Sequence, residues 1–411
     1  MKHVSVLVGF LALLVILGWI EQLLHRRRLK QLRIRIHVNG SRGKSSVTRL
    51  IAAGLRAAGI ATVAKTTGTL PRLILPDGRE RPIPRGCRPT VLEQIGVVRA
   101  ATATGAEALV VECMALTPSL QWLSERQLIQ ATHCVITGAR EDHLDVMGPT
   151  ERDVALALAG TIPPHGTLLT ADERYTDVYR RAADDRHCSL LTVSPAEVDQ
   201  VTEVELARFS YIEHAENVAL ALAACAAVGV ARDAALAGMQ QSMPDPGALM
   251  IWHVCSRDKE IWFVNGLAAN DPRSSETIWN FALARFPLAE RRLALFNCRG
   301  DRPERSWRLG QAYAAWQAAD RCVLIGGGVH HFARAAGESG LDMQRVVLAP
   351  EQTAEAIFDT LIELAAPTTL IVGLGNIGGL GLELIEHVRS LGVPCLPTPS
   401  AGADPNHTRT S

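Results

Sequence analysis

Short apolar runs alternate with longer helical patterns through most of the chain. The β-branched runs RIRIHVNG, ATVAKTTG, EALVVECM and THCVITG are typical of strands, and three of them stop at a glycine. From Lys44 to Ala58 the apolar positions recur near every 3.6 residues and the pattern ends at Gly59, which predicts a helix. Further helical patterns lie at 118–130, 150–160 and 215–230. This alternation predicts an α/β fold with a parallel sheet covered on both faces.

The same alternation resumes after a turn-rich break, MPDPG, at 243–247. The runs EIWFVNG, RLALFNC, DRCVLIGGG, QRVVLA and TTLIVGLGN predict the strands of a second, smaller α/β domain. The glycine-rich turn in the last run is interpreted as structural, because no acidic residue of a dinucleotide-binding unit follows it. The expected domains are a membrane anchor (1–24), a basic juxtamembrane segment (25–35), an ATP-binding domain (36–243), a C-terminal α/β domain (244–396) and a disordered tail (397–411).

The N-terminus carries the one strongly apolar segment of the sequence. Val4 to Ile20 contains no charge, and as a helix it would span about 26 Å, close to the ~30 Å of a bilayer core. A basic cluster at 25–35 follows it, which favours a cytoplasmic location for the rest of the chain. A cleaved signal peptide fits less well, because the charge follows the apolar run and no A-x-A-like site ends it. We expect a single-pass anchor in the inner (cytoplasmic) membrane, with the catalytic domains in the cytoplasm.

Composition narrows the class of protein. Lys plus Arg and Asp plus Glu both number 42, so the formal net charge is zero, and a general nucleic-acid binder would instead carry a basic surplus. The 9 cysteines are scattered without a CxxC pair, which is typical of reduced thiols in a cytosolic compartment.

The stretch IHVNGSRGKSSVTRL, from Ile36 to Leu50, places a glycine-rich turn between a predicted strand and a predicted helix. Its spacing is shorter than that of the common phosphate loop. Backbone N–H groups and the positive end of the helix would converge on an anion, Lys44 would reach the outer phosphates, and the Ser45 hydroxyl would bind Mg²⁺. The alternative is a plain turn with a solvated lysine, but the context favours a nucleotide site. Its candidate residues are Asn39, Gly40, Ser41, Arg42, Gly43, Lys44, Ser45 and Ser46.

The shortened loop, Gly-Ser-Arg-Gly-Lys-Ser, resembles the loop of the Mur ligase family. Further segments resemble that family in the same order: VVECM, EDHLDVMGPT, HAENVALALAA, NGLAANDPRSS and FNCRGDRPERS. Each segment alone has an ordinary explanation as a helix cap, a turn or a paired carboxylate. A closer resemblance, covering residue 35 to about 381, is to the membrane-associated poly-γ-glutamate synthases (PgsB or CapB type), in which an anchor replaces the N-terminal substrate domain.

The resemblance implies an ATP-dependent amide ligase that activates a γ-carboxylate as an acyl phosphate and builds a capsular or secreted poly-γ-glutamate. It implies ATP and two Mg²⁺ ions as cofactors. The implied partners are glutamate, the growing anionic polymer and a small hydrophobic membrane subunit, in an oligomer. The implied catalytic residues are Lys44, Glu112, His143 and Arg302; the metal ligands Ser45, Glu112 and His143; the further nucleotide contacts Asn217, Arg299 and Asp301; and the substrate contacts Lys65, Thr67, Asn270 and Asp271.

Two departures from the wider family stand out. No lysine lies between Lys65 and Lys259, so the carbamylated lysine that many Mur ligases use cannot come from the expected region. The histidine of the Ala-His-Asn-Pro segment is also replaced, with Ala269 beside Asn270. A Mur or folylpolyglutamate-like ligase acting on another substrate, and a membrane-tethered P-loop ATPase that drives a partner, remain the alternative interpretations.

Overall fold

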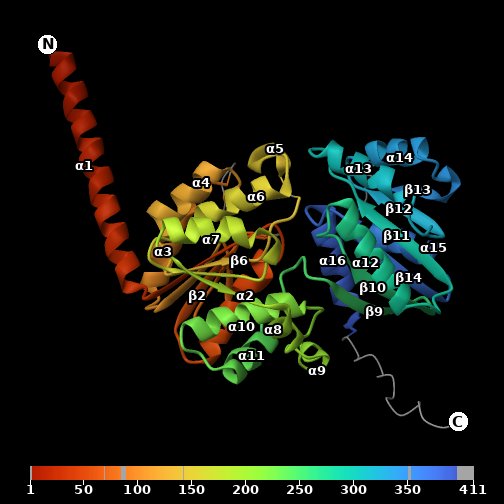
Figure 1. Cartoon of the computed structure of the whole chain (residues 1–411). Helices are drawn as coiled ribbons and strands as arrows, with labels where there is room; N and C mark the ends of the chain where they lie inside the picture. Colours follow the sequence, from red (N-terminus) through yellow and green to blue (C-terminus); the bar gives the residue numbers. More distant parts are fainter. Residues whose placement is uncertain (1, 69, 85–88, 142, 350–352, 396–411) are drawn as a thin grey trace, which may run out of the picture. The chain divides into compact units, whose positions relative to one another are not determined.

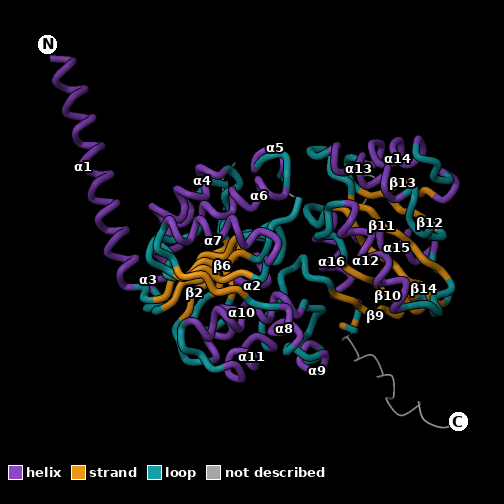
Figure 2. Tube along the Cα trace, in the orientation of Figure 1, coloured by secondary structure: helices purple, strands orange, loops and turns teal. Residues whose placement is uncertain are grey.

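The computed structural model describes residues 2–68, 70–84, 89–141, 143–349 and 353–395. The tail predicted to be disordered, 397–411, lies outside the described residues. The chain divides into two compact units, which Figure 1 colours along the sequence and Figure 2 by secondary structure. Unit 1 comprises Met1–Leu206 and His214–Met243, and unit 2 comprises Ala207–Glu213 and Pro244–Ser411.

Unit 1 is built on an eight-stranded sheet with the order β4-β3-β2-β5-β1-β6-β7-β8. Its pairs are parallel except for β2 with β3 and β3 with β4, which are antiparallel. The strands are β1 (Ile34–Asn39), β2 (Thr62–Thr66), β3 (Arg72–Ile74), β4 (Glu80–Pro82), β5 (Ala108–Glu112), β6 (His133–Ile136), β7 (Thr167–Thr170) and β8 (Ser189–Thr192).

Helices cover both faces of this sheet. Figure 1 shows α3, α4, α6 and α7 on one face and α2, α10 and α11 on the other. The helices of the unit are α1 (Lys2–Gln31), α2 (Lys44–Ala57), α3 (Glu93–Ala103), α4 (Pro118–Leu123), the π-helical η1 (Ser124–Ile129), α5 (Leu144–Met147), α6 (Glu151–Leu158), α7 (Thr176–Asp185), α8 (Pro195–Asp199), α9 (Glu203–Leu206), α10 (Ala215–Ala227) and α11 (Arg232–Gln240), with short 3-10 turns at Ala159–Thr161 and Glu173–Tyr175.

The central strands are buried on both sides, which explains their continuous apolar sequences. Every residue of β5 is buried, and so are the last four residues of β1. Strands of this kind belong to parallel sheets with helices on both faces. The predicted α/β fold of this region is therefore confirmed.

Helix α1 begins the unit and joins it through its C-terminal end. Leu29 and Leu32 pack into the core cluster that contains Val97 and Ile129. The ring nitrogen Nε2 of His25 lies 2.9 Å from the Leu128 carbonyl. The apolar side chains from Val4 to Leu24 are exposed instead. By length and composition, Val6–Gln31 could cross a membrane.

Unit 2 has a seven-stranded sheet in the order β13-β12-β11-β14-β10-β9-β15. The five strands predicted for this region are present as β10 to β14. Residues of α12, α13 and α14 share one core cluster, and residues of α15 and α16 share another. The elements are β9 (Met250–Ser256), β10 (Lys259–Asn265), α12 (Pro272–Arg285), β11 (Arg291–Asn297), α13 (Pro303–Tyr313), β12 (Arg321–Ile325), α14 (Val329–Glu338), a 3-10 turn (Met343–Arg345), β13 (Val346–Ala349), α15 (Ala354–Leu364), β14 (Thr368–Gly375), α16 (Leu380–Leu391) and β15 (Val393–Pro394).

Candidate active site

The glycine-rich turn connects the end of β1 to the start of α2, as its sequence predicted. Gly43 has φ 79°, in the left-handed region, and caps the helix. A Cβ at Gly43 would lie 2.7 Å from Oδ1 of Asn217, and a Cβ at Gly40 would lie 2.0 Å from Oγ1 of Thr137. Both contacts are closer than side chains allow, so the backbone path of this loop requires glycine at the two positions.

The segment after β6 holds the loop in place. The Ser41 N–H donates to the Gly138 carbonyl at 2.9 Å, and the Ser41 hydroxyl lies 3.0 Å from both the N–H and the carbonyl oxygen of Arg140. The Thr137 hydroxyl donates to the Arg42 carbonyl. The contacts of Ser41 therefore fix the position of the loop relative to the segment after β6.

Lys44 lies over the loop that precedes it. Its ammonium group donates to the carbonyl oxygens of Gly40 at 2.6 Å and of Ser41 at 3.3 Å. A lysine in this position brings a positive charge to the first turn of α2, where the helix end also attracts anions. Ser46 is half-buried on the same turn.

Glu112 is the residue that joins the loop to the neighbouring strands. It ends β5 with only 2 % of its surface exposed, and its Oε2 accepts hydrogen bonds from the Ser45 hydroxyl at 2.9 Å and from the Thr67 N–H at 2.6 Å. Lys65 pairs with Val111, so the next residue, Thr66, lies beside Glu112. The buried hydroxyl of Thr66 has no hydrogen-bond partner among the residues that the structure describes. A carboxylate and two hydroxyls form the oxygen-rich donor set that Mg²⁺ prefers, so these residues fit a bound magnesium ion.

His143 and Asn217 differ in how closely the structure ties them to this site. Asn217, on the first turn of α10, touches the loop at Gly43. His143 caps α5 with φ 47°, three residues beyond Arg140, and its neighbour Asp142 lies outside the described residues. Within the described ranges no three His, Cys, Asp or Glu side chains gather as a metal site. The second metal ion on Glu112 and His143 stays a prediction.

Lys65 and Asn39 point to the opposite face of the sheet from Glu112. Lys65 is 0 % exposed and its ammonium lies 2.9 Å from Oε1 of Glu93. The Asn39 amide donates to Gln121 at 2.8 Å, and its oxygen accepts from the Gly40 N–H at 2.9 Å. These contacts stabilise the domain, so for Lys65 and Asn39 the structure offers no support for the predicted ligand contacts.

The remaining predicted site residues belong to unit 2. Arg299 and Asp301 follow β11 and pair with each other through two hydrogen bonds, each 2.8 Å long. The Arg299 guanidinium lowers the pKa of Asp301 through this pairing. Arg302 is exposed and precedes the first turn of α13. Asp271, next to Asn270, accepts from the Ser274 N–H at 2.9 Å and so caps α12.

Two buried groups near the loop, Asp172 and His37, are not among the residues predicted from the sequence. The Asp172 carboxylate, after β7, accepts the Ala139 N–H at 2.7 Å and so fixes the segment that braces the loop. Nδ1 of His37 lies 2.9 Å from the Glu125 carboxylate. Burial by itself lowers the pKa of His37, but Cys113 and Glu125 outweigh that effect and raise it to about 9. An acidic residue just after the apolar run TLLT was the only signal for Asp172.

The comparisons with known proteins first define a class. The family model of the Mur ligase middle domain matches residues 38–225. Escherichia coli FolC, in a complex with DHPP and ADP, has a TM-score of 0.62 and 15% identity, covering 90% of this chain and 92% of that one. Mycobacterium tuberculosis folylpolyglutamate synthase complexed with ADP has a TM-score of 0.64 and 18% identity, covering 91% and 93%. Unit 1 and its loop therefore have the fold of the Mur ligases.

Sequence relatives narrow this class further. The model of the poly-gamma-glutamate synthase CapB C-terminal domain matches residues 251–391. The PGA synthase CapB of Bacillus subtilis (strain 168) is 34% identical over 379 residues, which cover 92% of this chain and 95% of the relative. The capsule biosynthesis protein CapB of Bacillus anthracis is 35% identical over 381 residues, covering 91% and 80%. The chain belongs to the CapB family of poly-γ-glutamate synthases.

Proposed function

We propose that this protein is an ATP-dependent amide ligase that builds poly-γ-glutamate. Membership of the family supports the reaction. One observation in unit 1 supports the chemistry most strongly: the buried Glu112 carboxylate accepts a hydrogen bond from the hydroxyl of Ser45, the residue that follows Lys44. A plain strand-to-helix turn would not need a buried carboxylate at this point, because an uncompensated buried charge is costly.

The ligase must activate a carboxylate, because a carboxylate resists attack by an amine. Its oxygen attacks the γ-phosphorus of ATP, an O–P bond forms, and the bond to ADP breaks, which leaves an acyl phosphate. The amine of the incoming amino acid then attacks the acyl carbon. A C–N bond forms, the bond between the acyl carbon and the phosphate oxygen breaks, and phosphate leaves. The amine loses a proton.

The residues of unit 1 have matching roles in the first step. Phosphoryl transfer is catalysed mainly by positioning and by neutralising charge. Lys44 and the backbone of the loop would hold the phosphates, while Ser45 and Glu112 would hold Mg²⁺. The metal ion neutralises phosphate charge when bound. A second metal ion on His143, adenine contact by Asn217, and phosphate contacts by Arg299, Asp301 and Arg302 belong to this proposal through the family motifs.

The exposed apolar helix α1 supports a membrane location. We place it as a single-pass anchor in the cytoplasmic membrane, with both units on the cytoplasmic side, where ATP is available. Glutamate and the growing polymer are the proposed substrates. A small hydrophobic membrane subunit and an oligomeric assembly complete the proposal, and the family resemblance is their support.

The proposed function predicts that ADP forms only when an acceptor and a donor are both present. In purified full-length protein with ATP and Mg²⁺, adding glutamate together with a γ-glutamyl acceptor should raise ADP release well above the rate with neither. The measurement is coupled ADP release, with polymer length followed by gel electrophoresis. ADP release at full rate without glutamate would favour the energy-coupling ATPase instead, and activity with a different amino acid alone would favour another ligase substrate.

A further inference from the structure

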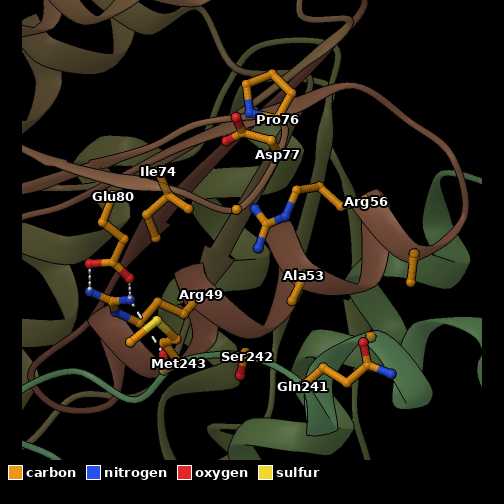
Figure 3. A pocket seen from close by; sticks show the side chains of 13 residues that line it. Arg49, Ala53, Arg56, Ile74, Pro76, Asp77, Glu80, Gln241, Ser242 and Met243 are labelled. Carbon is orange, nitrogen blue, oxygen red and sulfur yellow. Dashed lines mark hydrogen bonds and ion pairs between the residues drawn. The ribbon is translucent and has the colours of Figure 1, made fainter.

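A cavity of about 340 Å³ lies beside α2, and none of the loop residues 39–46 lines it. Figure 3 shows its walls. One is the face of α2 that carries Arg49, Ala53 and Arg56, a second is the turn between β3 and β4, and the third is the end of α11. The turn contributes Ile74, Pro76, Asp77, Gly78 and Glu80, and the segment at α11 contributes Gly238, Gln241, Ser242 and Met243.

One of the two arginines in this cavity is electrically compensated. The Arg49 side chain is 3% exposed and binds both carboxylate oxygens of Glu80 through its two terminal nitrogens, Nη2 at 3.1 Å from Oε2. Its Nη1 also donates to the Met243 carbonyl at 3.3 Å. Arg49 therefore ties the hairpin to the helix and has a counter-charge of its own.

Arg56 forms no such ion pair with any residue that the structure describes. It lies two turns further along the same face of α2, and its Nη1 is buried without a hydrogen-bond partner. Burial lowers the pKa of its guanidinium, and the charges of Glu80 and Asp77, which act in the opposite direction, do not cancel this effect. The acidic neighbour Asp77 accepts hydrogen bonds from the Arg79 side chain at 2.6 Å and from the Arg79 N–H at 3.0 Å.

A buried guanidinium donor left unbonded is costly, whereas an anion placed against it would satisfy the donor. In Figure 3 the Arg56 side chain extends beneath the hairpin turn, into the space between Ile74 and Asp77. The cavity is thus wide enough for a small organic molecule and contains one open cationic donor.

The surroundings indicate which anion fits. Arginine's planar fork matches a carboxylate in a two-point contact. Asp77 and Glu80 also line the cavity, and each is paired with an arginine, which leaves Arg56 as the main source of positive charge. One such charge balances a carboxylate monoanion better than a dianion such as phosphate. Ala53, Ala57 and Ile74 give apolar contacts for a short carbon chain.

We propose that this cavity binds a carboxylate of a small acidic ligand, with Arg56 as the anchoring group. Two sources of that chemistry exist for this chain, free glutamate and a residue of the γ-linked polymer, and naming them rests on the proposed function. The cavity would act as a binding site separate from the phosphate loop, on the same helix that begins with Lys44 and Ser45.

The test uses the full-length Lys44→Ala protein in detergent micelles without nucleotide, so that no turnover occurs and the result does not depend on the ligase reaction. Calorimetric titrations with glutamate, with a γ-glutamyl oligomer and with inorganic phosphate compare the ligands. Adding Arg56→Gln should weaken carboxylate binding by about tenfold or more, because a charged hydrogen bond is lost. Arg56→Lys should retain part of the binding.

Arg81→Gln is the matched control, because Arg81 is exposed on the same hairpin and does not line the cavity. It should bind as the parent does. The stronger of the two carboxylate ligands identifies the natural source. Carboxylate binding that is unchanged by Arg56→Gln, or absent altogether, would overturn the proposal, and so would phosphate binding as tight as that of glutamate. Because the titrations contain no ATP, their result can be interpreted even if the protein does not catalyse the proposed ligase reaction.

Discussion

Replacing Lys44 by alanine should reduce glutamate-dependent ADP formation by roughly two to three orders of magnitude, the loss typical for a removed charge-stabilising group. The ammonium group lies over the loop carbonyls at Gly40 and Ser41, on the first turn of α2. Lys65, the next lysine in the sequence, faces away from Glu112 and pairs with Glu93, so it could not substitute for Lys44. Initial rates of ADP release at saturating ATP measure the effect.

A lysine outside the site provides the control. Lys30 is exposed at the end of α1, and Lys30→Ala removes the same charge without touching the loop. Its rate of ADP release should stay close to that of the parent. A Lys44→Ala protein that retains its melting temperature and also retains more than half of the parent rate would contradict the role given to this residue.

Replacing Glu112 by glutamine should give the second large effect and should change the dependence on magnesium. Glutamine is nearly isosteric and can still accept from the Ser45 hydroxyl and the Thr67 N–H, so the fold around β5 should persist. The negative charge that would hold the metal ion is lost, however. We expect a loss of about a hundredfold in rate at fixed magnesium, an effect of the size seen when one preorganised electrostatic group is removed, and a higher magnesium concentration for half-maximal activity.

Rates measured across a magnesium titration test this prediction. Glu107→Gln is the matched control, because Glu107 directly precedes the other end of β5 and pairs on the surface with Arg33 at 2.7 Å. Exposed pairs of this kind contribute little, so this variant should follow the parent curve. If Glu112→Gln lost activity with an unchanged magnesium requirement, Glu112 would be acting through structure alone.

The sheet and its loop could be predicted from the sequence because their causes are local. Strands buried on both faces need unbroken apolar runs, as in β5, and glycine marks the turns that need positive φ, as at Gly43. The hairpin of β3 and β4 was not predicted, since each of its strands has only three residues and no clear alternation. This hairpin forms a wall of the cavity at Arg56, so that cavity could not be predicted from the sequence either.

The contacts that depend on distant parts of the chain were harder to infer. Asp172 acts by accepting a hydrogen bond from Ala139, 33 residues earlier, which no local pattern indicates. Lys65 pairs in register with Val111, the residue before Glu112. Since side chains alternate along a strand, Lys65 must face away from Glu112. The register of β2 against β5, which decides the face on which Lys65 lies, is set by the fold and cannot be inferred from either segment alone.

We propose that the loop at Gly40–Ser45 presents a triphosphate whose terminal phosphoryl group passes to a carboxylate oxygen. The most direct measurement uses a γ-glutamyl acceptor labelled with ¹⁸O in its reacting carboxylate, with the released phosphate analysed by mass spectrometry. Transfer through an acyl phosphate predicts that one labelled oxygen appears in phosphate for each amide bond formed. Unlabelled phosphate released alongside new amide bonds would contradict the claim.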